Sequence, residues 1–373
     1  MQASDRPSIE ELENLLWLKA NDDLRVYAIL DGDWADGLYG RLVNTNDLSW
    51  AHMFQGRSAL ANVQNSPFIV ALKRGHKFNK WLIGEGWGQG WGIYFLASVE
   101  AAKNLYGERE VDPRFLPSNR EQIKLGNFTE GRTDPLWLIR RHFRAFSDVE
   151  LEPRSKIVDF RYYDPATLRI YLPTCNEQEL IHFFGPVGAF VTDGYHRADI
   201  LNRKQDMYLF STREENGRRQ FCGRLIDLIN GDKTNLRVHP ASEQTAERDS
   251  APYTMIRKAQ YDAFRDANHD EFVTSATDRI CKLLQAAGLR PNKKNTEEFV
   301  VRQIPVANAH NLQSEKEIMG FLTCGVVFGE GFENKMLEAN NILKAHKIKP
   351  EPNVGDRLSN LANFGIRSQG VRR

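Results

Sequence analysis

The chain has 373 residues, of which 41% are hydrophobic and 27% are charged, and its formal net charge is +1. This balance is typical of globular proteins with a sizeable core, and the length is sufficient for two domains. A net charge so close to zero gives no bulk electrostatic reason to expect nucleic acid or a membrane as a partner.

Targeting and redox features indicate a cytoplasmic protein. The N-terminal residues are acidic and helical in pattern, without the basic start and apolar stretch of a signal peptide, and the apolar runs are too short to span a bilayer. The four cysteines lie far apart without metal-ligand spacing: Cys175, Cys222, Cys281 and Cys324. We therefore expect free thiols in a reducing compartment.

The N-terminal part of the sequence mixes helices and strands. Ser8 and Glu11 form the pattern of a capping box at the start of a helix over 8–20. Short apolar runs predict three strands, at 24–30, 67–72 and 91–98. A short helix follows the third strand and ends at Gly107. The pattern is lost over 108–133, which we interpret as a loop or an inserted segment.

Helix-start signals recur from residue 134 onward. Asp134 is placed to cap one helix, and Asp164, which is followed by a proline, is placed to cap another after a strand at 156–163. Thr174 and Glu177 have the spacing of a capping box, which predicts the start of a third helix.

The C-terminal part of the sequence changes character. A hairpin is predicted over 207–223 with its turn at Asn216-Gly217. Residues 231–250 are polar and without pattern, which is typical of a linker. Beyond residue 251 only helical patterns occur, and Pro305 is expected to kink or end one of these helices early.

The fold class that these elements predict is α+β. A mixed α/β domain is expected over 1–245, in one or two lobes, and an all-α helical domain over 252–373. Ser314 and Glu317 form a capping box within the helical part.

Each candidate motif for a cofactor, a metal or a nucleophile lacks a residue that the motif requires. The stretch GEGWGQGWG at 84–92 has Gln89 where a dinucleotide-binding fingerprint needs its third glycine, so we interpret it as a flexible loop that carries tryptophans. The stretch 31–42 lacks the glycine and the bidentate glutamate of a calcium loop. We therefore expect no catalytic residue, no cofactor and no metal.

Arginine and aromatic residues are the candidates for a binding surface. Such side chains are favoured at interface hot spots, because they bury a large area at low entropic cost. Five residues are hypothesised to contact a partner protein: Trp87, Trp91, Arg161, Tyr162 and Tyr163.

Five motifs together resemble the family named domain of unknown function 4123. They are Trp91-Gly92 at a strand start, His142-Phe143-Arg144 at a helix end, the run Arg161 to Pro165, Leu172-Pro173, and the run Phe183 to Pro186. The stretch VYAILDG at 26–32 is similar to the family's first strand, and the later helices are similar to an extension that many members carry. The resemblance runs over roughly residues 12–190 and departs from the family over 108–133.

The resemblance implies a role that is not enzymatic. Members are adaptor chaperones of bacterial type VI secretion, which bind a cognate toxic effector in the cytoplasm and load it onto the VgrG spike, in some cases with a PAAR tip protein. The expected partners are therefore an effector, VgrG and in some systems PAAR, with neither nucleic acid nor a membrane. The family does not supply the contact residues.

Two other functions stay open at this point. A hydrolase with carboxylates that are assembled in space leaves no sequence spacing to recognise. A nucleic-acid-binding protein needs a contiguous basic face, for which only RRHFR at 140–144 and REENGRR at 213–219 are local hints.

Overall fold

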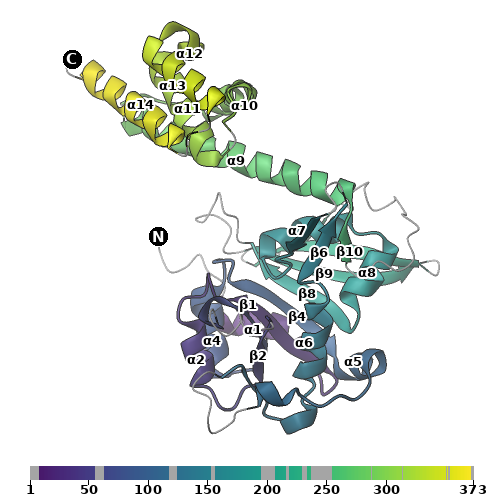
Figure 1. Cartoon of the computed structure of the whole chain (residues 1–373). Helices are drawn as coiled ribbons and strands as arrows, with labels where there is room; N and C mark the ends of the chain where they lie inside the picture. Colours follow the sequence, from purple (N-terminus) through teal and green to yellow (C-terminus); the bar gives the residue numbers. More distant parts are fainter. Residues whose placement is uncertain are drawn as a thin grey trace. The chain divides into compact units, whose positions relative to one another are not determined.

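The computed structural model shows two compact units, Met1–Arg265 and Asp266–Arg373 (Figure 1). The described residues are 8–54, 63–116, 124–152, 156–194, 206–215, 218–228, 233–236, 254–286, 288–312, 314–349, 351 and 353–370. The first unit contains two β-sheets and several helices, and every described element that lies wholly in the second unit is a helix. The predicted fold class, a mixed α/β part followed by a helical part, is confirmed.

The larger sheet of the first unit has nine strands among the described residues. Their order is β11-β10-β9-β8-β4-β1-β3-β2-β5, and each neighbouring pair is antiparallel. The strands are β1 (Leu24–Asp31), β2 (Trp50–His52), β3 (Pro67–Ala71), β4 (Gly92–Ser98), β5 (Gly126–Asn127), β8 (Val187–Asp193), β9 (Asp206–Glu215), β10 (Arg218–Asp227) and β11 (Lys233–Asn235). The strands predicted at 24–30, 67–72 and 91–98 are confirmed as β1, β3 and β4.

Apolar side chains cover both faces of the central strand β1. Tyr27 and Ile29 belong to one hydrophobic cluster, whereas Val26, Ala28 and Leu30 belong to another. Successive side chains of a strand point to opposite faces, so a strand with this pattern needs a packing layer on each side. The first cluster includes residues of α5 (Val99–Tyr106), α6 (Leu136–Arg144), α7 (Pro165–Thr174) and α8 (Glu177–Phe184), and the second includes residues of α1 (Ile9–Leu16), α2 (Leu38–Val43), α4 (Lys77–Gly86) and the 3₁₀ turn η2 (Val63–Asn65).

A smaller sheet leads into the long helix of the chain. Its order is β12-β6-β7, with β6 at Asp148–Leu151, β7 at Lys156–Asp159 and β12 at Thr254–Ile256. Strand β12 pairs in parallel with β6 and is followed at once by α9 (Lys258–Ala286). The Glu152 carboxylate accepts the Lys258 N–H at 2.7 Å. The boundary between the two units falls inside α9.

The segment 108–133 is built into the first unit wherever it is described. It contains the 3₁₀ turns η3 (Pro113–Phe115) and η4 (Gly131–Thr133) as well as β5, which pairs with β2. Val111, Phe115 and Phe128 are buried in the first hydrophobic cluster. Residues 117–123 lie outside the described residues.

The predicted linker at 231–250 lies largely outside the described residues. Within it, Lys233–Asn235 form β11, which pairs with β10 at the edge of the larger sheet. The hairpin predicted over 207–223 is confirmed by β9 and β10, while its turn at 216–217 lies outside the described residues. The domain limits at 245 and 252 stay a prediction, and the contacts place the division of the chain at Arg265–Asp266.

The second unit packs its helices around one apolar cluster, in which Phe321, Leu322 and Cys324 are fully buried. The helices that follow α9 are α10 (Lys293–Ala309), α11 (Glu315–Phe328), α12 (Phe332–Lys335), α13 (Leu337–Ile348) and α14 (Val354–Gly370). The expectation that Pro305 ends its helix early is wrong, because α10 continues to Ala309. Pro305 lies on the exposed face of α10, where water can replace the hydrogen bond that a proline cannot donate.

Capping signals in the sequence are confirmed at three of the predicted helix starts. Ser8 with Glu11 and Ser314 with Glu317 form reciprocal capping boxes. Asp164 caps α7: its Oδ1 accepts the N–H groups of Ala166 at 2.7 Å and Thr167 at 3.1 Å.

The capping box predicted at Thr174 and Glu177 is wrong. Asn176 is the N-cap of α8, and Glu179 completes the box. The Thr174 hydroxyl instead donates to the Tyr171 carbonyl at 2.7 Å.

Replacing Asp164 by alanine is expected to lower the free energy of unfolding by about 1 kcal/mol, because two N–H groups at the start of α7 lose their acceptor. Urea unfolding of the two proteins measures the difference. Asp164→Asn keeps a capping oxygen and should lose only a fraction of this amount. An Asp164→Ala protein as stable as the wild type contradicts the capping role.

Candidate protein-binding site

Two stretches that the sequence singled out separately meet at Asp31, the last residue of β1. The Asp31 N–H donates to the Trp91 carbonyl at 2.7 Å, and the Arg161 Nη2 group donates to the Asp31 Oδ2 atom. The Asp31 side chain is 5% exposed, whereas that of Arg161 is 40% exposed. Burial raises the pKa of the Asp31 carboxyl, and the Arg161 guanidinium acts against this rise. Arg161 is thus fixed at one end and partly exposed, while its Nε atom is buried.

The glycine-rich stretch 84–92 is not a flexible loop. Gly84 and Gly86 belong to α4, and Gly86 has no room for a Cβ atom because the Trp91 ring packs against it. Gly88 and Gly90 form a buried turn with φ angles of 75° and 69°, which favour glycine. Their N–H groups donate to the Asp193 Oδ2 atom at 2.8 and 3.2 Å. The glycines therefore fix the backbone that carries Trp91.

The Trp91 ring extends this arrangement to the surface of the first unit. It packs on the Trp81 ring with centroids 5.0 Å apart. Arg41 belongs to α2, and its guanidinium lies 4.4 Å from the centre of the Trp81 ring. Both tryptophans are half-buried, and Arg41 is exposed.

A cleft of about 560 Å³ opens beside these rings, which we call the Trp81 cleft. It lies between α2 and α4 and is lined by Gly37, Gly40, Arg41, Asn44, Thr45, Lys77, Phe78 and Trp81. Arg41 and Lys77 form no ion pair with any other described residue. An aromatic wall with two uncommitted cations suits an anchor that is apolar and carries a carboxylate or a carbonyl at its end.

Three of the five hypothesised contact residues are core residues. The exposed fraction is 4% for Trp87, 1% for Tyr162 and 8% for Tyr163. The Tyr162 ring stacks on Phe143 with centroids 5.6 Å apart. For these three residues an exposed anchor is contradicted. Trp87 follows α4 and packs on Tyr94 in the second hydrophobic cluster. The two tyrosines are buried in the first cluster, because β7 ends at Asp159 and the chain turns after it. For Trp91 and Arg161 contact with a partner stays a prediction.

Arg41, Lys77 and Trp81 were missed by the sequence argument. Lys77 and Trp81 are four residues apart, which places them on one face of a helix, and His76 is the N-cap of that helix. This signal was present in the sequence. Nothing in the sequence indicated that Arg41 of α2 would lie over the same ring.

Two motifs that carry the family resemblance pack against each other beneath the larger sheet. The buried ring of His142 on α6 donates from Nε2 to the Phe183 carbonyl at 2.9 Å, so Nδ1 accepts the hydroxyl of Tyr106 at 2.8 Å. Gly185, at φ 46°, lies directly against this ring. Burial lowers the pKa of His142 to about 4, so the imidazole is neutral at physiological pH and serves the packing of α6 on α8.

This neutral histidine predicts a loss of stability in acid. In the unfolded chain its pKa is about 6.5, so between pH 6.5 and about 4 the unfolded state binds a proton that the folded state does not. The contribution of His142 is fully present above pH 6.5. It is lost as the pH falls through this window, by at most about 1.4 kcal/mol per pH unit. Urea unfolding of the wild type and of His142→Gln should give curves that converge toward acid, and parallel curves contradict the role of His142.

Side chains that could hold a metal ion are not grouped in any described part of the chain. No three His, Cys, Asp or Glu side chains there lie as a metal ion requires. The buried Asp134 carboxylate, whose pKa is raised by burial, accepts the Ser49 hydroxyl at 2.6 Å and the Leu136 N–H at 2.9 Å. It therefore supports local structure at the start of α6. No helix in the described part of the chain is long and apolar enough to cross a membrane.

The fold and this surface thus describe a mixed α/β unit with an accessible cleft of aromatic and basic side chains. Residues 132–181 match the model of a family described as a domain of unknown function, DUF4123. This segment includes α6, β6, β7 and α7, and with them His142 and Arg161. No curated protein and no solved structure matches the chain.

Proposed function

We propose that this protein is an adaptor that binds a toxic effector in the cytoplasm and loads it onto the VgrG spike of a type VI secretion system, with or without a PAAR tip protein. The proposal is supported by the match of residues 132–181 to the DUF4123 family and by the resemblance of the wider chain to adaptors of that kind.

The observation that carries the proposal is that each of the two compact units has a described cleft with large side chains at its wall. A loading adaptor has to hold two proteins at the same time. The first unit has the Trp81 cleft of about 560 Å³, and the second has a groove of about 690 Å³ between α13 and α14. Each unit has its own apolar core, so each cleft has a rigid support.

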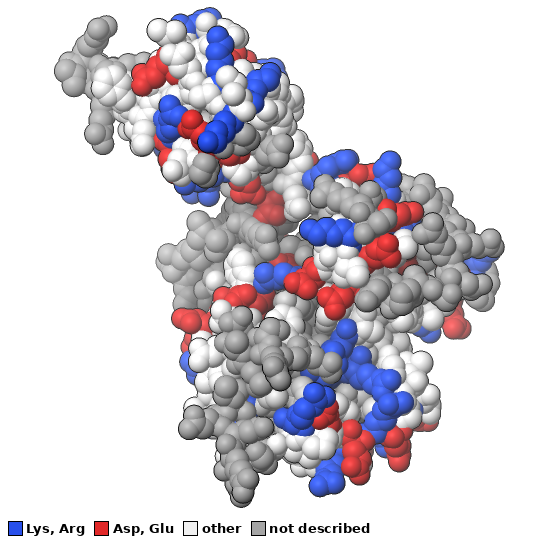
Figure 2. Space-filling model, in the orientation of Figure 1, with Lys and Arg blue, Asp and Glu red and all other residues white. Residues whose placement is uncertain are grey.

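No specific observation favours the two alternatives. A hydrolase of the kind considered needs two carboxylates at one cleft, and the lining of each described cleft contains at most one. A nucleic-acid-binding protein needs a contiguous basic face, whereas on the face shown in Figure 2 basic and acidic side chains lie side by side.

The test uses the bacterium that makes the protein. Deleting its gene should abolish secretion of one toxic effector while the effector is still produced, and the affinity-tagged protein should recover that effector together with VgrG. Arg41→Ala and Trp81→Ala should weaken capture of a partner about 5- to 30-fold, the usual scale of a hot spot.

Matched controls are Arg109→Ala and Leu105→Ala. Leu105 is exposed on α5 and Arg109 is exposed just after it, and neither residue lines the Trp81 cleft. They should leave capture unchanged. Normal secretion of every effector by the deletion strain would refute the proposed function. Unchanged capture by the Arg41 and Trp81 variants, with secretion still dependent on the protein, would show that the Trp81 cleft is not a contact surface.

A further inference from the structure

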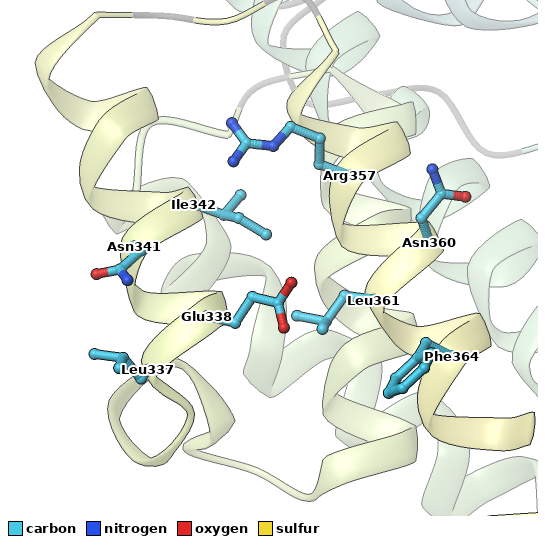
Figure 3. Close-up of a pocket in the computed structure, with 8 residues that line it drawn as sticks. All are labelled: Leu337, Glu338, Asn341, Ile342, Arg357, Asn360, Leu361 and Phe364. Carbon is cyan, nitrogen blue, oxygen red and sulfur yellow. The ribbon is translucent and has the colours of Figure 1, made fainter. Parts of the chain in front are cut away.

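The groove between α13 and α14 has an apolar lining that remains uncovered. Figure 3 shows it with Leu337, Glu338, Asn341 and Ile342 on α13 facing Arg357, Asn360, Leu361 and Phe364 on α14. Ile342 and Leu361 form a floor that is at most 7% exposed, whereas Leu337 is 79% and Phe364 is 71% exposed. Exposing two large apolar side chains at one groove is unfavourable unless a partner covers them.

The spacing of the lining residues produces two ridges with a furrow between them. On α13 the lining residues are pairs four positions apart, Leu337 with Asn341 and Glu338 with Ile342. On α14 the pairs are Arg357 with Leu361 and Asn360 with Phe364. In helix packing, the furrow between such rows receives the side chains of another helix.

The groove is lined by one acidic and one basic side chain, Glu338 and Arg357, of which only Arg357 has a described ion-pair partner. The Glu338 side chain extends from α13 toward Leu361 (Figure 3), and Glu338 forms no ion pair or hydrogen bond with any described residue. Arg357 is neutralised by its ion pair with Glu351. A partner therefore gains most if it places a cation beside Glu338 within an apolar surface.

The backbone of the second unit favours a helical occupant. An extended peptide gains affinity by adding a strand to a sheet edge, but every described element that lies wholly in this unit is a helix. A helix satisfies its own N–H and C=O groups and can enter such a groove without desolvating unpaired backbone.

We infer that the groove between α13 and α14 binds an amphipathic helix of a partner protein, whose apolar stripe covers Phe364 and Leu337 and whose lysine or arginine pairs with Glu338. This inference rests on the proposed function, since the partner is one of the two proteins that the adaptor holds.

The test uses the effector and the VgrG protein that the tagged wild-type protein recovers. It measures the dissociation constant of each of them with the wild-type protein and with its variants. For one of them, Phe364→Ala should weaken binding about 5- to 30-fold and Glu338→Lys by at least about 10-fold. Glu338→Gln should have a smaller effect than Glu338→Lys. Ile348→Ala is the matched control, because Ile348 is 86% exposed on α13 but does not line the groove. It should change the constant less than about twofold. Circular dichroism establishes that each variant is folded.

A photoreactive phenylalanine at position 341 then identifies the occupant. The expected cross-linked peptide is an amphipathic partner segment that contains a lysine or arginine. If both partners bind the groove variants as tightly as the wild type, the inference is wrong while the proposed function stands. If the wild type captures neither partner, both fail. A wild-type dimer that Phe364→Ala converts to monomer, or a cross-link within the chain itself, also overturns the inference.

Discussion

Replacing Gly185 by alanine should lower the free energy of unfolding by about 3–5 kcal/mol, enough to remove a large part of the stability of a typical domain. A Cβ atom at this position would lie 2.4 Å from Cε1 and 2.9 Å from Nδ1 of His142. The His142 ring cannot move away, since hydrogen bonds hold both of its nitrogens. In addition, a φ of 46° is strained for alanine.

Gly131 provides a control for a positive φ without the contact to His142. Its φ is 77°, but nothing lies within 4 Å of the position that a Cβ atom would occupy. Gly131→Ala should therefore lower the free energy of unfolding by only about 1–2 kcal/mol. The double change His142→Ala with Gly185→Ala should be less destabilising than the sum of the single changes, because the clash is absent once the His142 ring is removed. Equal effects at Gly185 and Gly131 would show that the His142 contact is unimportant.

Replacing Arg257 by alanine should lower the free energy of unfolding by about 3–5 kcal/mol. Its side chain is 7% exposed and pairs with Glu179, with Nε 2.6 Å from Oε1 and Nη2 3.1 Å from Oε2. The Nη2 group also donates to the Thr174 carbonyl at 2.8 Å. Removing the cation leaves the Glu179 carboxylate, itself only 17% exposed, without its partner. Of the described hydrogen bonds in this region, the start of α9 would then keep only those of Gln260 to Glu179 and Cys175.

An exposed ion pair supplies the comparison for Arg257. Arg302 and Glu330 are about half exposed, so Arg302→Ala should have an effect of at most about 1 kcal/mol. Thermal and urea unfolding of the two variants measure this contrast. Adding Glu179→Gln to Arg257→Ala should restore part of the lost stability, because the unpaired buried charge is removed. No restoration would mean that the desolvated carboxylate is not the cause of the loss.

Signals that act within a few residues could be predicted from the sequence. The caps at Ser8, Asp164 and Ser314 each involve a side chain and N–H groups that are at most three positions apart. The buried strand β1 could be predicted for a similar reason, since its apolar run matches two covered faces. These features need no knowledge of distant parts of the chain.

Competing local signals could not be resolved in the same way. Thr174 and Asn176 are both good N-cap residues, and each has a glutamate three positions later. The structure uses Asn176 with Glu179, and Glu179 also binds Arg257, which is far away in the sequence. No local pattern contains that contact.

The candidate site depends on contacts between elements that are distant in the sequence, so only part of it could be predicted. Trp91 and Arg161 were identified as accessible candidates, but their meeting at Asp31 requires the packing of three separate segments. Tyr162 was proposed as a contact residue because aromatic residues are favoured at interfaces, and a strand was predicted as far as residue 163. The strand ends at Asp159, and the ring is buried against Phe143.

The strand order of the larger sheet has a consequence for synthesis of the protein on the ribosome. Strand β4 lies between β1 and β8, yet residues 99–186 separate β4 from β8 in the chain. At about 5–20 residues per second, translation of these residues lasts on the order of 5–20 s. During that time the edge of β4, whose sequence is GIYFLAS, has no native neighbour on one side. Such an apolar edge can pair with the same edge of other nascent chains. The yield of soluble protein in fast, high-level expression should therefore depend on factors that cover β4 until Val187–Asp193 has been synthesised.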